Sequence, residues 1–129
     1  MPQVKFTDAK GLYQNAGTGG LFFEIDTVTQ ATNSETAVTS NGVCGVITTA
    51  ALDEATSAST GFTVNNSKVA ATSLVIACVV DYDGAANGIP VATVDDISAG
   101  AFTMRVSNAG SATLNAACKI GYLVIGAAS

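Results

Sequence analysis

The sequence contains no histidine and no tryptophan, and only 12% of its 129 residues are charged. Histidine is the side chain that most often serves as a general base or a metal ligand near neutral pH. Without it, Ser-His-Asp and Cys-His catalytic arrangements cannot be built, and a zinc site is not expected. These absences favour a structural or binding role and predict that the protein is not an enzyme.

Long apolar runs are also missing, although the mean hydropathy of +0.41 is high. A membrane-spanning helix needs roughly 18 or more consecutive apolar residues. The longest apolar run here, residues 74–80, has only the length of a strand. We therefore expect the protein to have no membrane partner.

Positive charge is scarce, because five Lys and Arg residues stand against ten Asp and Glu residues and give a net charge of −5. The five cations are dispersed along the chain, whereas nucleic-acid binding needs a basic stripe. We therefore expect no nucleic-acid partner. Residues 1–5 (MPQVK) do not begin a basic segment followed by an apolar one, so we expect no signal peptide and synthesis in a cytoplasm.

Cysteine is limited to three residues, Cys44, Cys78 and Cys118. The number is odd, the spacing is wide and there is no Cys-x-x-Cys pair, so neither a disulfide framework nor a metal site is indicated. Each cysteine lies within an apolar run. Because free cysteine usually packs as a small apolar side chain, we expect three buried thiols.

Short segments rich in Val, Ile, Thr and Phe alternate with Gly, Ser, Asn and Asp, a pattern typical of strands joined by turns. We predict an all-β domain, an antiparallel β-sandwich that is jelly-roll-like or immunoglobulin-like, with a small barrel left open. Residues 50–59 are the best helix candidate, but Ser and Thr dilute the pattern and we interpret the segment as a loop with at most one turn of helix. The predicted strands are 21–27, 43–49, 61–65, 74–81, 90–94, 101–107 and 118–125.

Two of these strands show different patterns of side-chain polarity. In 101–107, Phe102, Met104 and Val106 share one face and polar residues share the other, which predicts a half-buried strand. Residues 74–80 are apolar on both faces, which predicts a central or covered strand. Since a monomer should not expose large apolar patches, this excess of apolar strand surface favours self-association.

The first part of the chain differs from the rest, because it is rich in Thr, Asn, Gly and Gln. We predict an N-terminal arm over residues 1–20 and one sandwich domain over residues 21–129, with the Phe22 strand in the sheet. The aromatic residues of this part are candidate partner-binding residues, and their alternative role is packing in the core. They are Phe6, Tyr13, Phe22 and Phe23.

Carboxylates are the remaining candidates for chemistry. Asp81 and Asp83 precede Gly84 as in the start of a calcium loop, but the alternating ligands and the later glutamate of such a loop are missing. Asp95 and Asp96 would join them if their strands paired, so a calcium site stays an open alternative to acids that only solvate loops. Glycosidase chemistry needs two carboxylates across a cleft, and nothing in the sequence places a pair so. We therefore predict no catalytic residue, no cofactor and no metal.

The part of the chain from Gly45 to Gly126 resembles small β-rich virion proteins of tailed phages of marine bacteria. The matching segments are GVITTAAL (45–52), GFTVNNS (61–67), AGAFTMRVSN (99–108), ATLN (112–115) and KIGYLVI (119–125).

The resemblance implies a structural protein of the virus particle. It leads us to expect a capsid decoration, or cement, protein on the outside of the head, bound to the major capsid protein and assembled as a homotrimer. The alternative is a tail-fibre or host-recognition module. The absence of a heptad pattern favours the decoration protein over the fibre.

Overall fold

The computed structural model describes residues 13–14 and 21–126 of the chain. These residues form ten strands and no helix. The strands are β1 (Tyr13–Gln14), β2 (Leu21–Phe22), β3 (Ile25–Thr29), β4 (Val38–Thr39), β5 (Cys44–Thr48), β6 (Ser59–Asn65), β7 (Leu74–Tyr82), β8 (Pro90–Ser98), β9 (Ala101–Asn108) and β10 (Cys118–Ile125).

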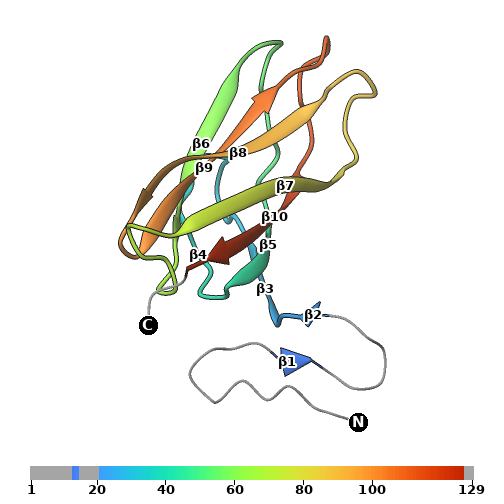
Figure 1. Cartoon of the computed structure of the whole chain (residues 1–129). Coiled ribbons are helices and arrows are strands. Elements are labelled where there is room, and N and C mark those ends of the chain that lie inside the picture. Colours follow the sequence, from blue (N-terminus) through green and yellow to red (C-terminus); the bar gives the residue numbers. More distant parts are fainter. Residues whose placement is uncertain (1–12, 15–20, 127–129) are drawn as a thin grey trace.

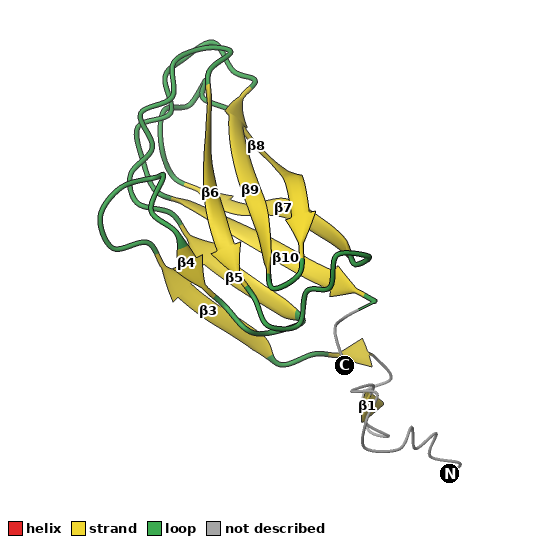
Figure 2. Ribbon diagram, turned by 90° about the vertical axis from the view of Figure 1, so that its left-hand side faces the viewer, coloured by secondary structure: helices red, strands yellow, loops and turns green. Residues whose placement is uncertain are grey.

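Eight of the strands build two four-stranded sheets that pack face to face, one in the order β3-β5-β10-β7 and the other in the order β4-β6-β9-β8 (Figures 1 and 2). The predicted β-sandwich is therefore confirmed. The sheets are mixed, however, since β3 pairs with β5 and β4 with β6 in parallel, while the other pairs are antiparallel. The parallel pairs arise because β3, β4, β5 and β6 alternate between the two layers, so neither β3 and β5 nor β4 and β6 are joined directly by a hairpin.

The strand predictions hold best in the second half of the chain. The range predicted for β10 is the range observed. Strands β8 and β9 begin where they are predicted to begin but continue beyond the predicted ends, to Ser98 and Asn108. The segment 21–27 is divided between β2 and β3, and β2 pairs with β1 instead of a four-stranded sheet, contrary to the placement predicted for the Phe22 strand. Residues 50–59 contain no helix, and Glu54 forms an isolated bridge with Leu114.

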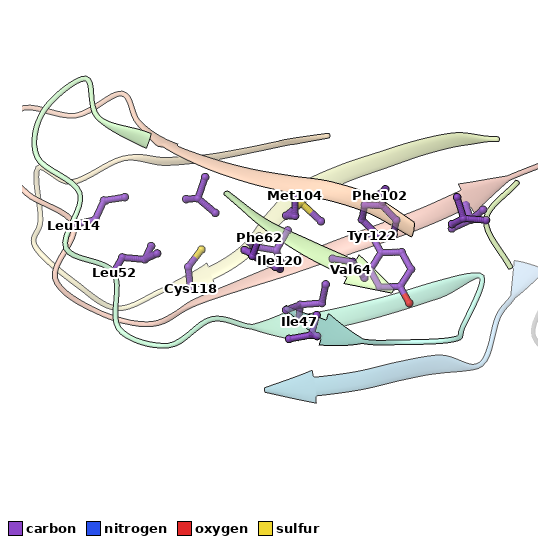
Figure 3. Close-up of a cluster of buried hydrophobic side chains, with 14 residues drawn as sticks. Ile47, Leu52, Phe62, Val64, Phe102, Met104, Leu114, Cys118, Ile120 and Tyr122 are labelled. Atoms are coloured by element: carbon purple, nitrogen blue, oxygen red, sulfur yellow. The ribbon is translucent and has the colours of Figure 1, made fainter. Parts of the chain in front are cut away.

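The core lies between the two sheets and follows the alternation of the strands. In β9, Phe102, Met104 and Val106 are buried as predicted, while the residues between them are half-exposed. From the opposite sheet, Ile120 and Tyr122 of β10 pack against them (Figure 3). The rings of Phe102 and Tyr122 meet at a tilt of 58° with centroids 5.4 Å apart, a favourable geometry for two aromatic side chains.

Strand β7 is an edge strand and its outer face is exposed, so the prediction of a central or covered strand is wrong. It pairs with β10 on one side only, whereas β10 lies between β5 and β7. The two-faced apolar pattern of β7 reflects one face packed on the core and a second face that is exposed. An apolar pattern on both faces of a strand therefore shows neither that both faces are covered nor that the strand has two neighbours.

Candidate interaction surface

The two outer faces of the sandwich differ in polarity. The outer face of the β4-β6-β9-β8 sheet is mostly polar, whereas the outer face of the β3-β5-β10-β7 sheet is mostly apolar. The polar face carries Thr39, Ser59, Thr63, Asn65, Thr93, Thr103, Arg105 and Ser107. We call the second surface the apolar face and define it by Ile25, Cys44, Val46, Leu74, Ile76, Cys78, Val80, Leu123 and Ile125.

Strand register places these side chains in continuous rows. Ile25 is paired with Cys44, Cys44 with Leu123, and Leu123 with Ile76, so one row crosses all four strands. Exposure is greatest at the two edges of the sheet, where Ile25 is 57% exposed and Ile76 56%. Leu74, paired with Ile125 beside this row, is 65% exposed.

The neighbouring row contains Gly121 of β10, and the side chains of β7 lie beside the space above this glycine. A Cβ atom on Gly121 would lie 3.0 Å from Cγ2 of Val80 and 3.6 Å from Sγ of Cys78, so both side chains flank the space above Gly121. Val46 continues the row in β5. The apolar face is therefore continuous from β7 to β5 in this row, and the β3 position of the row is Thr27.

Charge on this surface is confined to one end. Lys119 donates a hydrogen bond to Asp81 across 2.8 Å, and this contact raises the pKa of the lysine. Both side chains are about half exposed, so the pair adds little stability. Its effect is to neutralise the two charges at the border of the apolar face.

The apolar face gathers most of the exposed large apolar side chains of the described residues. The largest patch on a typical monomer is about 300–600 Å² and is often functional. Seven large apolar side chains are exposed in the described residues, and four of them belong to this face in β7 and β10. The apolar face is the candidate functional site, and it fits the sequence-based expectation of surplus apolar strand surface.

A buried polar cluster beside β3 and β10 has a structural role. The Ser40 hydroxyl donates to Oδ2 of Asp26 at 2.9 Å, and because it has a single proton, the Tyr122 hydroxyl donates to Ser40 Oγ at 2.6 Å. Asn66 donates to the Tyr122 oxygen at 3.3 Å. The Ser40 hydroxyl bond lowers the pKa of Asp26, and burial raises the pKa of Tyr122.

This cluster does not provide an open nucleophile. Ser40 is 1% exposed, and its only proton is held by a carboxylate. Tyr122 is also buried, and its raised pKa keeps the phenol protonated. The cluster instead fixes the segment between β4 and β5 to the core, because Asp26 also accepts from the backbone N–H of Asn41.

The four aspartates of the open calcium alternative are not brought together. Asp81 lies on β7 and is paired with Lys119, while Asp95 lies on β8 in the other sheet and contacts Arg105 at 2.6 Å. In the part of the chain that the structure describes, no group of three or more Cys, Asp or Glu side chains is arranged to hold a metal ion. The alternative required β7 and β8 to pair, and they lie in different sheets.

The four predicted partner-binding residues fall at or outside the limits of the described structure. Phe6 lies outside the described residues. Tyr13 and Phe22 are register partners in the β1-β2 ladder, but their side chains lie outside the described part. Phe23 is half-buried in the link between β2 and β3.

The three cysteines differ in exposure, so the prediction of three buried thiols is wrong for Cys78. Cys118 is buried, Cys44 is half-buried and Cys78 is exposed on the apolar face. Burial raises the pKa of Cys118 to about 11, with the nearby Asp81 charge as a smaller cause. Cys78 is exposed because β7 is an edge strand whose outer face is uncovered.

The fold and the surface define a two-layer, mixed β-sandwich with one polar and one apolar outer face. No protein-family model, curated protein or solved structure matches the chain. Within the described residues there is no helix that is long and apolar enough to cross a membrane.

Proposed function

We propose that the protein is a capsid decoration protein that binds the outside of a phage head and stabilises the shell. The observation that carries the proposal is the apolar face. This surface crosses the outer side of one sheet, and its defining side chains are apolar. Such a surface suits permanent attachment to another protein surface. The resemblance of residues 45–126 to small virion proteins of tailed phages supports the same role.

The proposed mechanism is mechanical. The sandwich is a rigid body that lays the apolar face on the major capsid protein, and the N-terminal arm adds a second contact through its aromatic residues. Linked contacts on one particle bind more tightly than each contact alone, because the second binding step becomes intramolecular. Shell expansion under internal pressure must then break these contacts in addition to those between shell subunits.

Electron cryomicroscopy of purified particles that carry the protein tests the location. The proposal expects density of the size of the sandwich on the outer surface of the head. Density on the tail alone would contradict it and would favour the tail-fibre or host-recognition alternative. Absence of the protein from particles would reject both virion roles.

A pair of variants tests the surface. Ile25→Lys places a charge on the apolar face at β3, and Thr63→Lys places the same charge on the exposed polar face at β6. Both sites are solvent-exposed, so both variants are expected to fold. Co-sedimentation with undecorated heads should be lost for Ile25→Lys and kept for Thr63→Lys. Equal loss, or no loss, would show that the apolar face is not the docking surface.

A further inference from the structure

The sandwich has four edge strands, and three of them carry features that discourage pairing with another chain. β4 has only two residues, and β3 has five with Asp26 among them. β8 begins at Pro90, bulges between Val94 and Asp96, and carries two adjacent aspartates. Short length, proline, bulges and charge are the usual means by which an edge strand avoids a new partner.

Strand β7 lacks these features over most of its length. It has nine residues, and residues 74–80 contain no proline, glycine or charge. Its one irregularity is a register shift at the C-terminal end, where Asp81 pairs with Lys119 and Val79 with Ile120. An edge that is long, regular and apolar is the kind that takes a further strand. β7 and β8 lie on the same side of the sandwich (Figure 1), so the contrast concerns neighbouring edges.

We infer that β7 pairs antiparallel with β7 of a second copy of this chain, around a twofold axis. The joined sheet has eight strands in two copies of the order β3-β5-β10-β7, and the two apolar faces merge into one. This pairing does not depend on the proposed role on a shell, because it concerns the free protein.

The side chains of β7 are complementary to themselves in one register. With the axis at Ala77, Ile76 lies opposite Cys78 of the second copy, and Leu74 lies opposite Val80. On the inner face Val75 lies opposite Val79, so each of the seven residues 74–80 meets an apolar partner. Moving the axis to Cys78 would place the charged Asp81 opposite Val75. Cross-strand pairs of apolar side chains stabilise a sheet, whereas a charge opposite an apolar residue does not.

The proposed contact between the two β7 strands is small, so the dimer should be weak. Pairing of one edge strand is at the low end of specific interfaces, about 1,000 Å² or less in total, so dimerisation should depend on protein concentration. Each copy has a net charge of −5, while residues 74–80 are uncharged. Added salt screens the repulsion between copies, so it should strengthen the dimer.

Light scattering across a range of protein and salt concentrations measures the mass. We expect a monomer–dimer equilibrium that shifts toward dimer with both. Ile76→Lys, on the exposed face of β7, should weaken dimerisation by at least about tenfold, and Val91→Lys, on the exposed face of β8, should leave it unchanged. A monomer at all concentrations overturns the inference, and so does the homotrimer that the resemblance to virion proteins implies.

Cysteine cross-linking tests the register. Ile76→Cys places a thiol opposite the native Cys78 of the second copy, within the Cα separation that a disulfide bridges. Val80→Cys is the matched control, because Val80 and Ile76 are both 56% exposed on the same strand. In the proposed register residue 80 is four positions, about 13 Å, from the partner's Cys78.

Mild oxidation should therefore give disulfide-linked dimers for Ile76→Cys and not for Val80→Cys. The reverse result, or equal cross-linking of both, overturns the proposed register. Because both experiments use free protein, a negative result leaves the shell-binding proposal standing. Conversely, absence of density on the head would not affect the dimer.

Discussion

Glycine in β5 shows how one residue can depend on a partner that is distant in sequence. A Cβ atom on Gly45 would lie 2.5 Å from Cε1 of Tyr122, and the ring is held in place by burial and by its hydroxyl bonds. Gly45→Ala should therefore destabilise the fold by about 1–3 kcal/mol, the usual cost of overpacking a core.

Gly61→Ala in β6 is the matched control for this prediction. Its Cβ atom would meet nothing closer than 3.5 Å, an ordinary contact. Alanine also restricts the unfolded chain more than glycine does, so this variant should be neutral or slightly stabilising. Urea unfolding midpoints compare the two. Similar midpoints would mean that the Tyr122 ring is free to move away.

Acid stability at the residue scale depends on Asp26. The hydrogen bond from the Ser40 hydroxyl is the main cause that lowers the pKa of Asp26 below its ordinary value of 3.8. A carboxylate with a lowered pKa in the folded state stabilises the protein above its unfolded pKa, and this stability is lost as the pH falls through the folded pKa.

The free energy of unfolding should therefore fall between about pH 5 and pH 2, and part of that fall should be missing in Asp26→Asn. The amide cannot ionise, so the difference between variant and wild type should shrink as the solution becomes acidic. Urea titrations at several pH values measure this difference. A constant difference would show that Asp26 is not a source of the acid sensitivity.

At the scale of elements, the strands with clear alternation could be predicted and their neighbours could not. Phe102, Met104 and Val106 identify β9 because one face is buried and the other is wet. β4 has only two residues, too few to show a period, and it was not predicted. The cluster of Ser40 and Tyr122 joins residues that are 82 positions apart, and no local pattern reports such a contact.

The candidate surface was partly visible in the sequence for the same reason. The apolar pattern of 74–80 indicated apolar surface on both sides of a strand, and the structure assigns the second side to an exposed face at an edge. The aspartates could not be placed, because the pairing of Asp81 and Asp95 with separate cations depends on which sheet each strand joins.

Removal of part of the N-terminal arm, residues 1–20, should affect attachment to heads without affecting the folding of the sandwich. β1 and β2 pair with each other and form no ladder with the two four-stranded sheets. Deletion of residues 1–15 should therefore leave the melting temperature of the sandwich nearly unchanged and weaken attachment to heads. Calorimetry and co-sedimentation measure the two effects. A collapse of the melting temperature would place the segment in the core instead.

At the scale of the whole molecule, the three cysteines differ in solvent exposure and can therefore be used to follow the unfolding of the sandwich. Cys78 is exposed on the apolar face, Cys44 is half-buried and Cys118 is buried between the sheets. Only a thiolate reacts with alkylating reagents, and the pKa of about 11 at Cys118 leaves it protonated at pH 8 in addition to being covered.

We expect a thiol reagent at pH 8 to modify Cys78 quickly, Cys44 slowly and Cys118 only when the sandwich unfolds. Peptide mass spectrometry after pulses of labelling in increasing urea would follow each site. Because both sheets share one core, the labelling midpoint of Cys118 should coincide with the unfolding midpoint seen by circular dichroism. Labelling of Cys118 in native buffer at the rate of Cys78 would contradict the burial of the Cys118 side chain in the core. A Cys118 midpoint well below the spectroscopic one would show that the β3-β5-β10-β7 sheet opens before the rest, and that the two layers do not unfold together.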